Sequence, residues 1–262
     1  MSIVLIVVSS FIGQAQDNDE TNYEIFNSYG NFGYSFAPVL FNKATITRNY
    51  GNTILTNRPI LSYQLGVVYH FQPAKEWGIN TGLTLTRLPI SNISFNLNDN
   101  DVYPGYGGSN KSKSIGSLFL SVPINVELKK QLAKNLYANL NFGINISFIP
   151  SDGYEEVYIY SNQELQESRE VFAMYQLTGS DNLNASIVLS GGFYFTLKHC
   201  LIKTNLVYNK SFKNIVEGEY QFGNLLVSEP TRGDYKISGD YFALATTIYF
   251  KIKKKHKKKK QH

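Results

Sequence analysis

The side chains in this sequence best suited to acid–base chemistry are its four histidines. His256 and His262 lie in a lysine-rich C-terminal tail, which leaves His70 and His199 as candidates for a general base. A hydrolase places a nucleophile beside such a base and a third group that orients the base. No motif in the sequence provides that set around either histidine. We therefore expect no catalytic residues and no enzymatic activity.

One stretch of amide and carboxylate side chains has the chemistry to bind a hard cation such as calcium. Calcium loops of the EF-hand type need a glycine at the sixth position, whereas Pro104 and Gly105 fall at the wrong spacing here. A solvated turn explains the stretch better, and we expect no metal and no cofactor. The side chains concerned are Asn96, Asn98, Asp99, Asn100 and Asp101.

The elements that carry these groups show a period of two. Successive side chains of a strand point to opposite faces, so each run has one apolar face and one face rich in amides and hydroxyls. This pattern is typical of a transmembrane β-barrel, with lipid outside and polar side chains inside. The two cleanest runs place apolar residues at Leu118, Leu120, Val122, Ile124, Val126 and Leu128, and at Leu136, Ala138, Leu140, Phe142, Ile144, Ile146 and Phe148.

About eight such segments occur, which predicts an all-β fold: a single closed, up-and-down antiparallel transmembrane barrel of about eight strands. No stretch of the sequence is continuously apolar over about twenty residues, so we expect no helical membrane span. The barrel should cover 33–250, with strands near 33–47, 59–71, 77–95, 115–128, 135–149, 183–197, 200–212 and 237–250.

The connections between these segments alternate in length. Short turns at 72–76, 129–134 and 198–199 alternate with long polar connections. Outer-membrane barrels have short periplasmic turns and long extracellular loops, so both termini should be periplasmic. We expect irregular loops rather than a second domain in the long connections 48–58, 96–114, 150–182 and 213–236.

Composition agrees with a protein embedded in outer-membrane lipid. Aromatic residues make up 14% of the chain and charged residues 17%, against about 25% charged in an ordinary soluble domain. The formal charge of +5 depends on eight lysines between 251 and 260, and the rest of the chain carries −3. The body of the chain therefore offers no basic surface for nucleic acid.

The N-terminus has the pattern of an export signal. Residues 3–12 form a short apolar run that ends before Gly13, Gln14 and Ala15, and an acidic segment follows. We expect a signal peptide at 1–15, a periplasmic N-terminal segment at 16–32 and a basic tail at 251–262 that could contact anionic head groups.

Two sets of side chains are candidates for a functional role. Glu127 and Lys203 should both point inward and pair, because side chains fill the interior of an eight-stranded barrel. Such a barrel should be too narrow for general diffusion. The tyrosines of the long connections either form a surface contact site or pack the loops on themselves: Tyr103, Tyr106, Tyr154, Tyr158 and Tyr160.

Pro123 interrupts the fourth segment, and we expect a local bulge there. The surrounding stretch Leu118–Lys129, with the return segment Leu136–Gly143, resembles the small PorT-like outer-membrane barrels of Bacteroidota. The resemblance extends over 16–250. It implies an outer-membrane barrel, and for one branch of that family it implies a part in secreting proteins across the outer membrane.

The last segment is similar to the signal read by the barrel-assembly machinery. It alternates apolar residues and ends in an aromatic one, although twelve residues follow where such signals usually end the chain. The positions concerned are Phe242, Leu244, Ile248 and Phe250.

Our main hypothesis is an integral outer-membrane protein with a structural or interaction role through its long loops. Three alternatives remain: an accessory component of a PorT-like secretion system, a lipid-modifying barrel enzyme, and a soluble lipocalin-like carrier. The carrier would need its apolar face inside and its polar face outside.

Overall fold

The computed structural model describes residues 23–50, 55–89, 93–95, 97, 99–108, 116–150, 152–178, 183–226 and 231–252. The expected signal peptide, most of the basic tail and parts of the long connections lie outside these residues. Two 3₁₀ helices, η1 (Tyr23–Ser28) and η2 (Asp99–Asp101), accompany fifteen strands. No described helix has the length and apolar character needed to cross a membrane.

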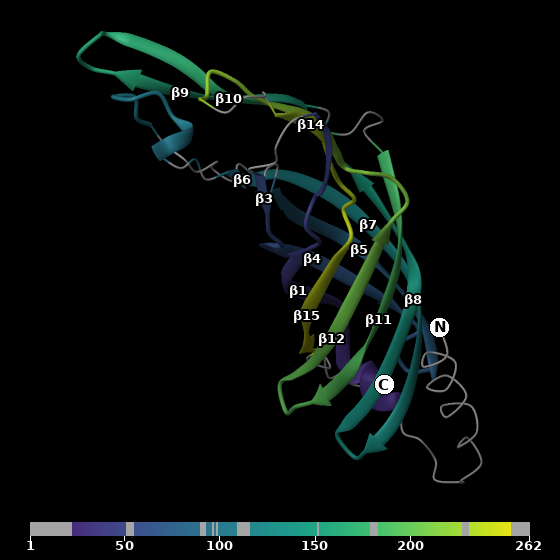
Figure 1. The fold of residues 1–262 in the computed structure, drawn as a ribbon. Coiled ribbons are helices and arrows are strands. Elements are labelled where there is room, and N and C mark those ends of the chain that lie inside the picture. The colour runs from purple at the N-terminus through teal and green to yellow at the C-terminus, as the bar shows by residue number, and fades with distance from the viewer. Residues whose placement is uncertain are drawn as a thin grey trace, which may run out of the picture.

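Eight strands close into an antiparallel barrel in the order β1-β15-β12-β11-β8-β7-β5-β4, which confirms the predicted fold (Figure 1). Closure comes from β1, which pairs with β4 on one side and β15 on the other. The strands are β1 (Tyr29–Phe41), β4 (Ile60–Phe71), β5 (Trp77–Pro89), β7 (Gly116–Ala133), β8 (Leu136–Phe148), β11 (Leu183–Thr196), β12 (Cys200–Ser211) and β15 (Tyr241–Lys251).

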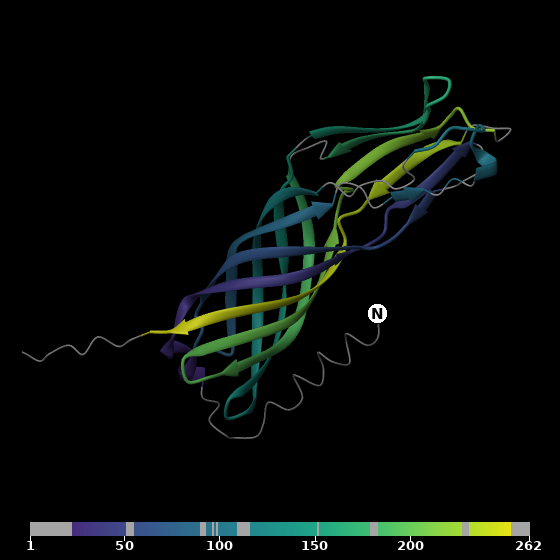
Figure 2. The ribbon, with the colours of Figure 1, turned by 90° about the vertical axis from the view of Figure 1, so that its left-hand side faces the viewer.

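The predicted irregular loops were wrong, because the long connections contain further strands. Five of them form a second sheet in the order β2-β14-β13-β10-β9, which we call the loop-end sheet, and β3 pairs with β6. In Figure 2 these strands extend beyond one end of the barrel. Their bounds are β2 (Thr45–Tyr50), β3 (Leu55–Asn57), β6 (Ile93–Phe95), β9 (Asp152–Asn162), β10 (Glu167–Thr178), β13 (Val216–Phe222) and β14 (Arg232–Ile237).

The two ends of the barrel differ. At the end away from the loop-end sheet, which we call the turn end, short connections join β4 to β5, β7 to β8 and β11 to β12. The start of β1 and the end of β15 lie there too, because Tyr29 pairs with Lys251. Strand β7 runs on to Ala133, so the predicted turn 129–134 shrinks to residues 134–135.

Pro123 does not cause the expected bulge. It stays paired with Asn145 of β8. On its other side, the pairing of β7 with β5 is interrupted between Thr81 and Thr84, but the register is the same before and after the interruption. The missing backbone donor of proline is therefore accommodated by a gap in one ladder and not by an extra residue.

The outer surface of the barrel is apolar on every strand, as the period of two predicts. Exposed apolar side chains of all eight strands include Phe36, Leu65, Leu83, Ile124, Phe142, Phe193, Leu206 and Phe242. The inner surface changes character along its length. Toward the turn end it is polar and charged, whereas toward the loop end it carries buried apolar residues such as Val39, Leu88 and Ala243.

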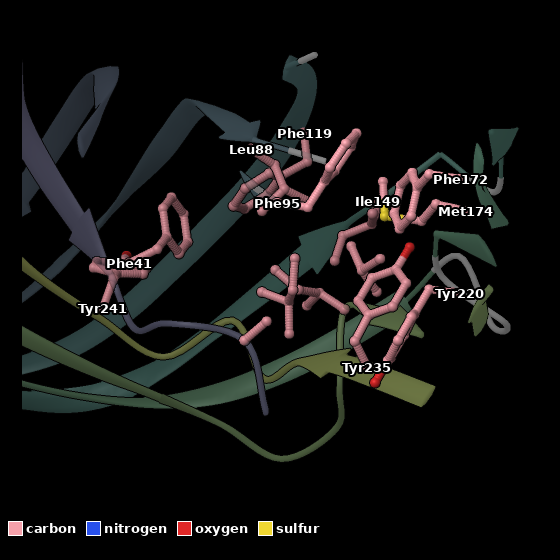
Figure 3. Packing of buried hydrophobic residues seen from close by; sticks show 14 of the residues in the cluster. Phe41, Leu88, Phe95, Phe119, Ile149, Phe172, Met174, Tyr220, Tyr235 and Tyr241 are labelled. Carbon is pink, nitrogen blue, oxygen red and sulfur yellow. The ribbon is translucent and has the colours of Figure 1, made fainter. Parts of the chain in front are cut away.

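Two apolar clusters flank the polar part of the lumen. The smaller one, at the turn end, contains Phe26 of η1. The larger one begins inside the barrel at Phe41 and Tyr241 and continues into the loop-end sheet at Phe172 and Tyr235, as Figure 3 shows. Barrel and loop-end sheet therefore share one hydrophobic core.

We predict that Gly143→Ala destabilises the barrel. A Cβ at Gly143 would lie 2.1 Å from the backbone oxygen of Ile124, so two strands must separate, at a cost of about 1–3 kcal/mol. Gly107→Ala is the control, because no atom of the described residues lies within 4 Å of that Cβ. Urea unfolding of the detergent-refolded proteins measures both, and equal midpoints would contradict the close approach of β7 and β8.

Candidate functional site

A buried carboxylate lies near the turn end of the lumen. Glu127 is 0% exposed, and three side chains contact its two oxygens. Lys203 Nζ donates to Oε1 at 2.6 Å, and Tyr194 OH lies 2.9 Å from Oε1 and 3.0 Å from Oε2. His70 Nε2 lies 3.0 Å from Oε2. The predicted luminal pair of Glu127 and Lys203 is thus formed, within a larger cluster of four residues.

Each member of this cluster comes from a different strand: β4, β7, β11 or β12. Tyr194 and Lys203 are register partners on β11 and β12, and Gly78 of β5 stands opposite Glu127. A Cβ on Gly78 would lie 2.7 Å from Nε2 of His70, so this glycine leaves room for the imidazole. The cluster ties four strands together across the lumen.

The two candidate bases lie in different surroundings. His70 is 2% exposed and points into the lumen, because it shares the inward parity of Gln64 and Ser62 on β4. His199 lies in the exposed turn between β11 and β12, where its backbone oxygen accepts a hydrogen bond from Lys251.

A ladder of asparagine amides extends from the cluster toward the loop end. Lys203 Nζ donates to Asn141 Oδ1 at 3.2 Å, and Asn141 Nδ2 donates to Asn139 Oδ1 at 2.8 Å. Asn205 Nδ2 donates to the same Asn139 oxygen at 2.9 Å, and Asn80 Nδ2 donates to Asn141 Oδ1 at 3.1 Å. The charged cluster and the amides therefore form one continuous polar network.

Helix η1 covers the turn end of the lumen. Its Phe26 is 1% exposed and packs edge-on against Tyr137 and Tyr194, with ring centroids 4.9 and 5.1 Å away. The ammonium of Lys129 lies 4.7 Å from the centre of the Phe26 ring and donates to the backbone oxygen of Pro73 at 2.5 Å. Aromatic rings thus separate Glu127 from this end of the barrel.

The loop end of the lumen is filled by apolar side chains. Phe41 and Tyr241 meet there with ring centroids 5.4 Å apart, and both are at most 5% exposed. Leu88 and Phe119 are buried in the same cluster (Figure 3). The polar network therefore lies between an aromatic layer and an apolar layer.

Chemically, this arrangement acts as a cross-link. An ion pair inside a narrow lumen is held only if its remaining hydrogen bonds are made, and here the phenol of Tyr194 donates to Glu127 while the amide oxygen of Asn141 accepts from Lys203. Among the described residues, no group of three or more His, Cys, Asp or Glu side chains could hold a metal ion. Asn96 and Asn98 of the acidic stretch lie outside those residues.

The candidate loop tyrosines divide into two groups. Tyr160 is 3% exposed, and the ring centroid of Tyr158 lies 5.0 Å from that of Phe95, so both tyrosines help to fill the larger core. Tyr103 and Tyr106 are half-buried around Arg169, whose guanidinium lies 4.4 and 4.8 Å from their ring centres.

Tyr106 OH donates to Glu167 Oε2 at 2.6 Å, and this hydrogen bond raises the pKa of the Tyr106 hydroxyl. Tyr154 pairs with Gln176 through the backbone, and its side chain lies outside the described residues.

The outward face of the loop-end sheet carries exposed acidic and aromatic side chains. Register partners align Glu155, Tyr175, Glu219 and Asp234 in one row across four strands. This row borders a hollow of about 460 Å³, and Arg232 also lines it. Acidic, aromatic and basic side chains thus lie within one surface hollow.

Sequence reasoning did not identify His70, Tyr194 and the asparagines as one network with Glu127. Their inward parity was readable, since each alternates with outward apolar residues. Which inward side chains meet depends on strand register and barrel shear, which the sequence does not specify. No pattern in the sequence indicated that Phe26 would cover the lumen.

No known family model matches the sequence, and no curated protein matches it. Among solved structures, the chain is similar to the outer membrane protein OprG of Pseudomonas aeruginosa, with 12% identity over 86% of this chain and 98% of that one and a TM-score of 0.44. Neisserial surface protein A shows 7% identity over 85% of this chain and 98% of that one, with a TM-score of 0.36.

The Ail protein of Yersinia pestis shows 11% identity over 83% of this chain and 99% of that one, with a TM-score of 0.28. Identities and scores this low carry no argument about function. The assignment of an eight-stranded closed barrel rests on the strand pairing itself.

We predict that Lys203→Met destabilises the barrel strongly. It leaves the buried carboxylate of Glu127 without its ammonium partner, and breaking a buried pair in this way costs about 3–5 kcal/mol. Adding Glu127→Gln should recover part of that loss, because the uncompensated charge is then removed. Urea unfolding of the two variants in detergent is the measurement. Additive effects of the two substitutions would contradict the coupling.

Proposed function

We propose that this chain is an integral outer-membrane β-barrel protein with a structural or interaction role and no catalytic activity. The observation that carries the proposal is the reversal of polarity across the barrel wall. All eight strands expose apolar side chains outward, while Glu127, Lys203 and the asparagines are buried inside. Lipid is the surrounding in which that arrangement is stable.

We further propose the orientation and the route of assembly. The loop-end sheet faces the exterior, and the turn end with both ends of the barrel chain faces the periplasm, as in barrels with short periplasmic turns. A signal peptide at 1–15 directs export, and the barrel-assembly machinery reads the last strand. Phe242, Leu244 and Phe250 of that strand are exposed on the outer wall, which suits recognition from the lipid side.

The interaction surface we propose is the outward face of the loop-end sheet. Val157, Ile159 and Tyr175 are 41%, 55% and 50% exposed there, beside the hollow bordered by Glu219 and Asp234. This face replaces Tyr158 and Tyr160 as the main candidate, because those two tyrosines belong to the core. The Tyr103 and Tyr106 pair around Arg169 remains part of the candidate surface.

Two alternatives keep a place beside this proposal. An accessory role in PorT-like secretion rests on the resemblance of 118–129 and 136–143, and retention of secreted cargo in a deletion strain would favour it. A lipid-modifying activity rests only on the position in the membrane, and changed lipid acylation in that strain would favour it. The lipocalin-like carrier needs an apolar interior and a polar exterior, the reverse of the observed faces.

The first test of the proposal is orientation in intact cells. An epitope inserted between Gln163 and Glu164, in the turn joining β9 to β10, should bind antibody added outside the cells. The same epitope between Lys134 and Asn135, at the turn end, should become accessible only after the outer membrane is permeabilised.

Heat-modifiable mobility on gels shows that both tagged proteins have folded. Labelling of the Lys134 insertion in intact cells would reverse the orientation, and recovery of folded protein in the soluble periplasm would reject the membrane location.

The second test concerns conductance. We expect no stable channel openings in planar bilayers, because the lumen is covered by Phe26 at one end and filled by Phe41, Leu88 and Tyr241 at the other. Phe26→Ala should also give none, since the apolar layer at the loop end remains. Long-lived openings in the unmodified protein would show that the lumen conducts.

A further inference from the structure

A chamber lies in the middle of the lumen, between the Glu127 cluster and the apolar layer at the loop end. Its volume is about 110 Å³. A cavity needs roughly 10–15 Å³ to hold one water molecule, and a cavity of about 150 Å³ holds benzene. The lining mixes apolar side chains with amides and hydroxyls, and its polar residues include Asn80, Asn125, Asn141, Asn145, Asn205 and Tyr249.

Five buried oxygens of residues that line the chamber have no hydrogen-bond partner within the described part of the chain. Oδ1 of Asn80, Asn145 and Asn205 has no partner, although these side chains are only 3%, 4% and 5% exposed. Oδ1 of Asn125 and the hydroxyl of Tyr249 lack partners as well. Since a buried polar atom without a partner costs about 1–3 kcal/mol, five such atoms around one chamber point to a guest.

The orientation of the amides follows from Lys203. Its ammonium can only donate, so Asn141 must offer Oδ1 to it and Nδ2 to Asn139 Oδ1. Asn205 must then donate its Nδ2 to Asn139, and Asn80 must donate its Nδ2 to Asn141. Turning either amide would place two acceptor oxygens against each other. The free oxygens of Asn80 and Asn205 are therefore fixed as acceptors.

We propose that the chamber is a binding site for a neutral guest that donates hydrogen bonds through O–H groups. Ordered water and a small polyol of about six heavy atoms or fewer share this chemistry and fit the volume. A cation suits the site less, because the ammonium of Lys203 lines the chamber and its carboxylate partner is already engaged. This inference does not depend on the proposed interaction role.

Tyr249→Phe tests whether the chamber is occupied. The substitution removes one unpartnered hydroxyl and keeps the ring that packs beside Tyr29 and Tyr194. With a guest bound, a hydrogen bond is lost and the urea midpoint of the full chain in detergent should fall by about 0.5 M. Tyr34→Phe is the control, because that ring is 63% exposed on the outer wall and its change should leave the midpoint in place.

Nuclear magnetic resonance identifies the guest in the same sample. Magnetisation transfer from water to the side-chain amides of Asn80 and Asn205 supports bound water. Transfer from the C–H protons of added glycerol to the same amides, lost on Asn205→Leu, supports a polyol. The proposal would be overturned if the urea midpoint of Tyr249→Phe equalled or exceeded that of the unmodified protein and neither water nor glycerol transferred magnetisation to these amides. That result would show a dry chamber.

Discussion

The rest of the structure depends on the pairing of β1 with β15. In the membrane location that we propose, no water can satisfy a strand edge, so the ladder must close on itself. The pair Tyr34 with Ile248 makes this closure and joins positions far apart in the sequence. Closure with eight strands also sets the width of the lumen to what side chains can fill. Every inward polar group must then find its partner among other inward groups or a small guest.

That requirement explains why the polar residues of the lumen form one network. Glu127 needs a cation, and Lys203 supplies it at 2.6 Å from the far side of the lumen. The same ammonium orients Asn141 and, through it, the other amides. One ion pair therefore both joins β7 to β12 and determines which atoms the chamber presents. Replacing the pair by apolar residues could preserve stability while abolishing that orientation.

The sequence located the eight barrel strands but not the strands beyond them. The predicted strands 33–47 and 77–95 each continue past the end of a barrel strand, at Phe41 and Pro89, into a strand of another sheet. Runs such as 136–148 alternate cleanly because one face is the exposed apolar wall of the barrel and the other meets the amides of the lumen. Val216, Tyr220 and Phe222 alternate as well, yet the length and polar composition of the connection 213–236 predict a loop. Their sheet draws strands from three separate connections, and pairings that distant leave no local signal.

The shared core changes what the long connections can do. The ring centroid of Phe172 lies 4.7 Å from that of Phe95 and 4.7 Å from that of Phe222. Residues from three connections therefore meet in one cluster, which continues to Phe41 inside the barrel. A surface held in this way is preorganised, and a partner that binds it avoids most of the entropy cost of ordering flexible loops. The outward face of the loop-end sheet should therefore recognise a partner by shape, as a rigid extension of the barrel.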